Sequence, residues 1–76
     1  MGLLKTFEVA IYNEEVREKI EEGARHRDLS DAWADTHYIE IQAETADEAR
    51  MKIARRYPAS QGYVIVDVSI SKFDEN

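Results

Sequence analysis

Apolar and polar residues alternate in three short segments of this chain, and this alternation limits what the chain can fold into. The segments are Thr6–Tyr12, His37–Ala43 and Tyr63–Ser71. A period of two is typical of a β-strand that buries one face and leaves the other open to solvent. We therefore expect three half-buried strands. The third strand is expected to bury Val64, Val66, Val68 and Ile70.

A first helix is expected directly after the first strand, over residues 14–22. Asn13 suits its N-cap, and the first turn is acidic, which the helix dipole favours. Its apolar stripe is thin, because only Val16 and Ile20 recur at helical spacing. We therefore expect this helix to be exposed and less firmly packed than the rest of the chain.

A second helix is predicted over residues 46–56. It is preceded by a capping box, in which the Thr45 side chain can bond the amide of Glu48 while Glu48 reaches back. Pro58 marks its end, because the residue before a proline disfavours helical backbone.

These elements predict one small domain over residues 1–76, with a frayed C-terminal tail at 72–76. Residues 25–35, between the first helix and the second strand, are the least regular stretch. Asp28 or Ser30 could cap a short helical turn there, and we expect Trp33 to lie at the edge of the core. The order β-α-(short helical turn)-β-α-β favours a two-layer α+β sandwich, with helices on one face of a three-stranded mixed or antiparallel sheet. A parallel βαβ unit made by the last three elements is the alternative.

Composition excludes several classes of protein. The chain has 76 residues and no cysteine, so it has neither a disulfide framework nor a thiolate metal site. No apolar run is long enough to span a membrane, so we expect a cytoplasmic protein without membrane contact. The net charge of −6 argues against non-specific binding of nucleic acid.

The sequence gives no arrangement typical of catalysis. Its serines stand in capping, turn and strand contexts, and no nucleophile is spaced beside a base. A group of residues could in principle form a divalent-metal cluster, namely His26, Asp28, Asp31, Asp35 and His37. Their spacing matches no zincin or EF-hand pattern, and acids at helical spacing are usually a solvated face. We therefore predict no enzyme activity, no metal site and no cofactor.

The open face of the sheet is one candidate partner-binding surface. If the strand registers align, aromatic and apolar side chains gather there, namely Tyr12, Tyr38, Tyr63 and Ile65. Acidic residues surround them, so stacking of nucleic-acid bases is unfavourable, whereas tyrosines suit a protein interface. Ordinary packing between neighbouring strands is the alternative explanation.

Charge is sorted along the chain, and this defines a second candidate surface. From residue 14 to residue 48, acids outnumber bases about three to one, whereas residues 49–66 contain no acid. The acidic candidates are Glu14, Glu18, Glu21, Glu22, Asp28, Asp31 and Asp35, around Trp33. The basic residues of the second helix are Arg50, Lys52, Arg55 and Arg56. They complement the helix dipole, and we expect them not to bind nucleic acid.

Two functions from different classes fit these observations. The first is a small acidic, non-enzymatic module that docks on a larger protein and modulates it, through the open face or the acidic stretch. A homodimer is compatible with it, formed by a strand edge or by the acidic first helix against the basic second helix. The alternative is an inhibitor whose acidic surface imitates nucleic acid. Small phage-encoded inhibitors, including anti-CRISPR proteins, are similar to this chain in size and charge.

Overall fold

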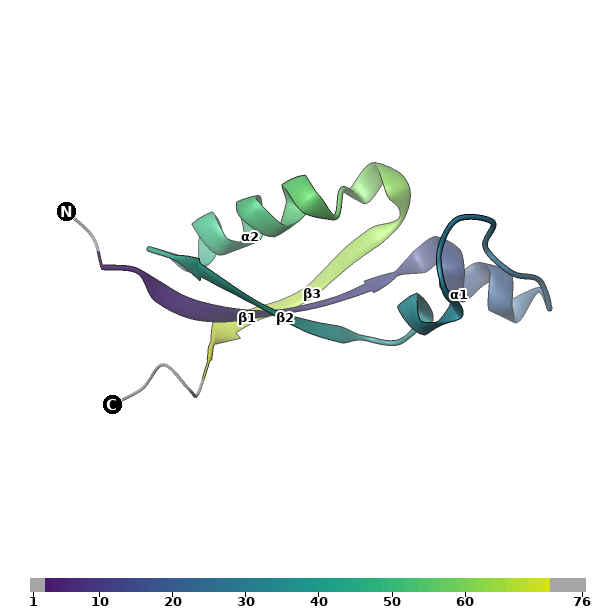
Figure 1. Ribbon diagram of the computed structural model, residues 1–76, viewed down its shortest axis with the longest axis horizontal. Helices are drawn as coiled ribbons and strands as arrows, with labels where there is room; N and C mark the ends of the chain where they lie inside the picture. The colour runs from purple at the N-terminus through teal and green to yellow at the C-terminus, as the bar shows by residue number, and fades with distance from the viewer. Residues whose placement is uncertain (1–2, 72–76) are drawn as a thin grey trace.

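The first strand occupies the centre of the sheet. The computed structural model describes residues 3–71, and within them β1 (Lys5–Asn13) pairs with β2 (His37–Ala43) on one side and with β3 (Tyr63–Ile70) on the other (Figure 1). Both pairings are antiparallel. The α+β prediction is therefore confirmed, and the sheet is antiparallel. The parallel alternative is wrong, because β1 lies between β2 and β3.

The helices occupy different places along this sheet. α2 (Ala46–Arg56) lies across one face, whereas α1 (Glu14–Glu21) continues from the end of β1 and extends past the sheet. The short 3₁₀ helix η1 (Asp31–Ala34) lies beside α1, and η2 (Ala59–Gln61) connects α2 to β3. The element order β-α-η-β-α-β is the one expected. The predicted frayed tail lies outside the described residues.

The core lies between α2 and the sheet. Val9 and Ile11 of β1 are fully buried against Ile53 of α2. At the other end of the same layer, Phe7 packs with Ala49. The small alanine lets the helix backbone approach the strands, so one helix covers the middle of this face.

Both helices begin at the predicted caps. The Asn13 side-chain oxygen accepts a hydrogen bond from the Val16 amide at 3.1 Å. The Thr45 hydroxyl accepts from the Glu48 amide at 3.1 Å, and the Glu48 carboxylate reaches back to the Glu44 amide at 2.7 Å. These bonds satisfy amides that have no partner inside the helix.

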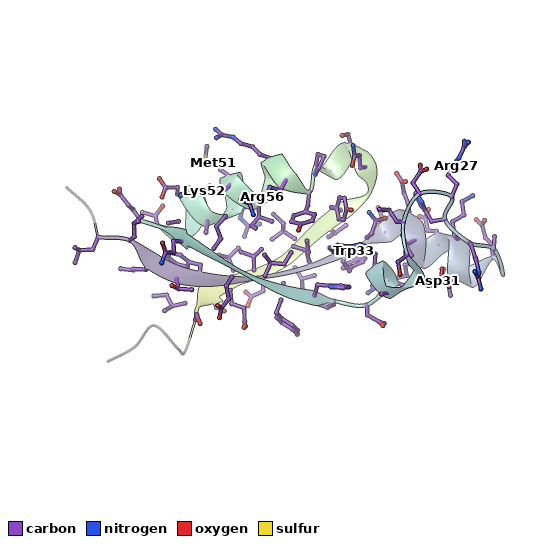
Figure 2. The ribbon with its side chains drawn as sticks, viewed as in Figure 1. Arg27, Asp31, Trp33, Met51, Lys52 and Arg56 are labelled. Carbon is purple, nitrogen blue, oxygen red and sulfur yellow. The ribbon has the colours of Figure 1, made fainter. Side chains whose placement is uncertain are left out.

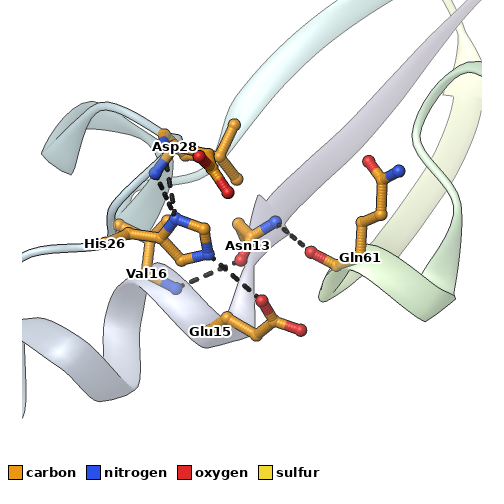
Figure 3. A network of polar contacts seen from close by, with 7 residues as sticks. Asn13, Glu15, Val16, His26, Asp28 and Gln61 are labelled. Carbon is orange, nitrogen blue, oxygen red and sulfur yellow. Dashed lines mark hydrogen bonds and ion pairs between the residues drawn. The ribbon is translucent and has the colours of Figure 1, made fainter.

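Asn13 also ties the start of α1 to η2. Its side chain is fully buried, and its amide nitrogen donates to the Gln61 carbonyl at 3.0 Å (Figure 3). Next to it, the Glu14 amide donates to the Gly62 carbonyl at 2.7 Å. Gly62 has φ +96°, a conformation that favours glycine. Residues far apart in sequence therefore meet at the junction of sheet and helix.

The molecule is elongated. Its principal extents are 48 × 23 × 15 Å, and its radius of gyration is 14.1 Å. A compact chain of this length has a radius of gyration of about 11 Å. The excess arises because α1 and η1 extend past the sheet and because, among the described residues, no helix covers its second face. That second face is called the open face below.

Candidate functional site

The pairing register defines which side chains lie on the open face. Thr6, Glu8, Ala10 and Tyr12 of β1 alternate with the buried residues Phe7, Val9 and Ile11. Their partners on the neighbouring strands are Gln42, Glu40, Tyr38, Ser69, Asp67 and Val64. The open face is this set of side chains, together with the exposed bulge residue Val66 described next.

A β-bulge in β3 changes the predicted face of its first residues. Ala10 pairs with Asp67 but Ile11 pairs with Ile65, so Val66 is an extra residue. The bulge reverses the alternation in the first part of β3. Tyr63 and Ile65 pack against the core instead of lying on the open face. Their predicted place in an open aromatic cluster is wrong. The predicted burial is also wrong for Val64, which pairs with Tyr12 on the open face, and for Val66 and Ile70, which are exposed.

Tyr63 instead belongs to an aromatic cluster on the α2 side of the sheet. The Trp33 ring stacks on His37 with a centroid distance of 4.2 Å, and Tyr63 meets Trp33 edge-on at 5.2 Å. Tyr57, at the end of α2, contacts both Trp33 and Tyr63. Burial and the neighbouring Tyr57 hydroxyl raise the pKa of Tyr63. Trp33 therefore packs at the edge of the core, as its sequence context predicts, and fastens η1 to the sheet.

Tyr12 lies on the open face, but another side chain covers its ring. The Arg17 guanidinium stands 3.7 Å from the ring centroid. The same guanidinium donates two hydrogen bonds to the Ala34 carbonyl, at 3.0 and 2.8 Å. Tyr12 therefore anchors α1 and η1 rather than offering a free aromatic surface. The sequence gives no direct signal for this contact, because it joins a strand, a helix and a distant turn.

Tyr38 and Val66 remain as exposed apolar groups of the open face, with 66% and 57% of their surface accessible. Carboxylates lie close to them along the sheet. Glu8 and Glu40 are direct partners across β1 and β2, and Asp67 pairs with Ala10 on the other side of β1. The open-face positions of the described strands hold no lysine or arginine. This face is thus apolar at Tyr38 and Val66 and carries carboxylates close to them, and the Arg17 guanidinium covers Tyr12.

The predicted acidic residues gather at one end of the molecule. We call α1, η1 and the loop between them the acidic end (Figure 2). It carries Glu14, Glu18, Glu21, Glu22, Asp28, Asp31 and Asp35, all exposed. In the part of the chain that the structure describes, none of these carboxylates forms an ion pair. The same segment also holds bases: Arg17 is occupied by Tyr12 and Ala34, whereas Lys19, Arg25 and Arg27 are exposed.

A pocket of about 390 Å³ lies where the acidic end meets η2. It is lined by Glu15, His26, Asp28, Leu29, Ser60 and Gln61. The Nδ1 atom of His26 accepts the backbone amides of Asp28 and Leu29 at 3.1 and 3.2 Å. The ring proton therefore sits on Nε2, which donates to Glu15 at 3.1 Å (Figure 3). Both ring nitrogens are thus used to shape the loop.

The second histidine also bonds to the backbone of the fold. The His37 ring nitrogen Nε2 bonds to the Ala32 carbonyl at 2.9 Å, so neither histidine contacts a hydroxyl nucleophile within residues 3–71. Over the same residues, no group of three histidine, aspartate or glutamate side chains could hold a metal ion. No described helix is long and apolar enough to cross a bilayer.

Comparison of the chain with models of protein families, with curated proteins and with solved structures gives no match. Its function must therefore be inferred from the surfaces themselves.

Proposed function

We propose that the protein is a small non-enzymatic module that docks on a larger protein through its open face and modulates that protein. The occupant that we propose is a basic amphipathic helix of the partner. The proposal is supported by the uncovered second face of the sheet, where Tyr38 and Val66 are exposed. Tyrosine in such a position is typical of the residues that dominate binding at protein interfaces.

The pairing of Glu8 with Glu40 is the observation that carries the proposal. Like charges directly opposite each other across two strands are destabilising. One of them, Glu40, accepts a hydrogen bond from the Ser71 hydroxyl at 3.1 Å, which leaves its charge in place. A lysine or arginine of a partner placed between the two carboxylates removes their repulsion. The repulsion between Glu8 and Glu40 destabilises the isolated sheet, and its removal contributes favourable free energy when a basic partner binds.

The opposite face of the same sheet shows what kind of element it accepts. α2 buries Ala49 and Ile53 against the strands and turns arginines toward solvent. A second helix of similar character on the open face would complete a helix–sheet–helix arrangement, a common solution for burying both faces of a sheet. The charges on the open face favour a basic helix over an acidic one.

Photo-crosslinking tests this proposal. A benzoylphenylalanine in place of Tyr38 is irradiated in a lysate of the source cell, and mass spectrometry maps the cross-linked peptide. We expect one larger protein to be cross-linked through a helical segment that has a basic side and an apolar side. We expect a lower yield of this cross-linked product when the chain also carries the substitution E40K. The same cross-linker at Glu44, which is exposed outside the open face, serves as the control. Linkage to an acidic segment, or equal capture from Glu44, would contradict the proposal.

A second candidate function, an acidic inhibitor that imitates nucleic acid, is favoured by the unpaired carboxylates of the acidic end. Such a surface would occupy the basic groove of a nucleic-acid enzyme. It is tested by a cross-linker at Glu21, with duplex DNA as competitor. Capture of such an enzyme from Glu21 and its displacement by DNA would put this candidate first.

A further inference from the structure

The outer face of α2 combines exposed cations with an exposed apolar side chain. Arg50, Arg55 and Arg56 are exposed, and none of them forms an ion pair with any residue from 3 to 71. Met51 beside them keeps 57% of its surface accessible. Lys52 differs, because it donates to the Gln42 carbonyl at 2.8 Å. The helix dipole explains bases in the last turn but not Arg50 or the exposed methionine.

The acidic end offers the complementary combination. The seven carboxylates of the acidic end named above are exposed and form no ion pair among the described residues, whereas Glu15 contacts His26 at 3.1 Å. α1 also exposes Ile20, with 43% of its surface accessible. The acidic end thus has more carboxylates than bases, the outer face of α2 has more bases than carboxylates, and each surface exposes one large apolar side chain. Charges of opposite sign on two surfaces favour their encounter and fix their relative orientation.

Within one molecule these two surfaces are held apart. Arg56 and Met51 lie on α2 above the sheet, whereas Asp31 lies past the end of the strands (Figure 2). The loop from α1 to η1 rises on the same side of the strands as α2 (Figure 1). The two surfaces therefore lie at different places along the 48 Å long axis of the molecule.

We propose that two copies of this chain form a twofold dimer, in which the outer face of α2 of each copy packs against the acidic end of the other. A twofold axis perpendicular to the long axis turns one copy end over end, so each acidic end lies over the partner's α2. Such an interface is isologous, and the same contact forms twice. Charge complementarity of the two unpaired surfaces identifies a second copy as the occupant.

The size of the molecule is compatible with this arrangement. A standard interface buries about 800 Å² on each partner, which is about one seventh of the 5591 Å² surface of the chain. Small domains gain stability from such association, because their own core is limited. The open face points away from the dimer contact, so this inference goes beyond the proposed docking function and does not depend on it.

Sedimentation equilibrium of the purified chain tests the dimer. We expect a dimer mass at about 20 mM salt and a shift toward monomer at about 0.5 M, where screening is strong. The variants E18K/E22K and R50E/R55E should each weaken the dimer about tenfold or more. The control E44K reverses one charge at an exposed residue outside both surfaces and should stay dimeric, whereas E18K, which makes the same charge change in the acidic end, should weaken the dimer.

Mixing the two weakened variants is the decisive step. In a mixed pair, the reversed acidic end of one chain faces the reversed α2 of the other, and the second contact keeps its original charges. Both contacts are therefore attractive again, and we expect the equimolar mixture of E18K/E22K and R50E/R55E to recover the dimer mass. General loss of folding cannot produce this recovery.

Three outcomes would overturn the dimer: a monomer mass for the unaltered chain at low salt, equal weakening by the control, or no recovery in the mixture. Circular dichroism checks that every variant is folded. If a charge reversal unfolds the chain, the neutral variants E18Q/E22Q and R50Q/R55Q replace it, and each must still weaken the dimer. Loss of the dimer leaves cross-linking from Tyr38 unaffected, so the two proposals fail separately.

Discussion

Replacing Gly62 by alanine tests how firmly the start of α1 is locked to the turn before β3. Gly62 has φ +96°, and left-handed backbone costs other residues about 1–2 kcal/mol. An added Cβ atom would lie 2.7 Å from Glu15 Cγ and 2.8 Å from Asn13 Oδ1. The buried Asn13 cannot move aside without weakening its cap on the Val16 amide, which is worth about 1 kcal/mol.

We therefore expect Gly62→Ala to lower the free energy of unfolding by about 2–3 kcal/mol. Urea denaturation followed by the fluorescence of Trp33 measures this loss. Gly23→Ala is the matched control, because Gly23 also has a positive φ of +77° but no atom within 4 Å of an added Cβ. The Gly23→Ala variant should lose only the free energy that left-handed backbone costs an alanine, about 1–2 kcal/mol.

Equal losses in the two variants would refute the reasoning, because the difference between them reports the crowding by Asn13 and Glu15. An increase of stability in Gly62→Ala would refute it as well.

Three further predictions concern single side chains. Asn13→Asp keeps the cap acceptor but loses the donor to the Gln61 carbonyl, and we expect urea denaturation to show a loss of about 1–3 kcal/mol; an unchanged midpoint would contradict this. Tyr63 has a pKa raised above 10.0 by burial and by Tyr57, so its contribution is present below pH 10.0 and is lost as pH rises through the folded pKa. Alkaline denaturation should therefore be less steep in Tyr63→Phe. Nitrogen NMR should show the neutral His26 ring with its proton on Nε2, and an Nδ1–H ring would be inconsistent with the loop geometry.

The sequence was sufficient where a few neighbouring residues decide the structure. Asn13 and Thr45 each bond an amide three residues along, so both helix starts could be predicted from local chemistry. Exposure of α1 followed from its thin apolar stripe, and Val16 is its buried residue. The acidic end could be predicted because helical spacing and the adjoining turn bring its carboxylates together without help from distant strands.

The sequence was insufficient where the face of a strand residue depends on pairing. Residues 63–66 of β3 are all aromatic or aliphatic, so their alternation does not say which of them lie inside. The polar residues Asp67 and Ser69 indicate which face of β3 is open in its second half. The extra residue Val66 reverses the alternation between there and Tyr63, so the first half of the strand has the opposite orientation. The covered ring of Tyr12 depends on Arg17 and the distant Ala34, a meeting that no local pattern encodes.

The attachment of α1 and η1 to the sheet has a consequence for how the molecule opens. Val16 is the buried residue of α1, and η1 has no buried residue within the described chain. The tethers are few: the Asn13 side chain and the Glu14 amide bond to residues at η2, Arg17 crosses Tyr12, and Trp33 packs in the aromatic cluster. Because few apolar groups join this end to the sheet, we expect it to form a cooperative unit of its own with a low opening free energy. On this expectation, the chain joins a firmly folded sheet to a charged segment that unfolds and refolds while the sheet persists.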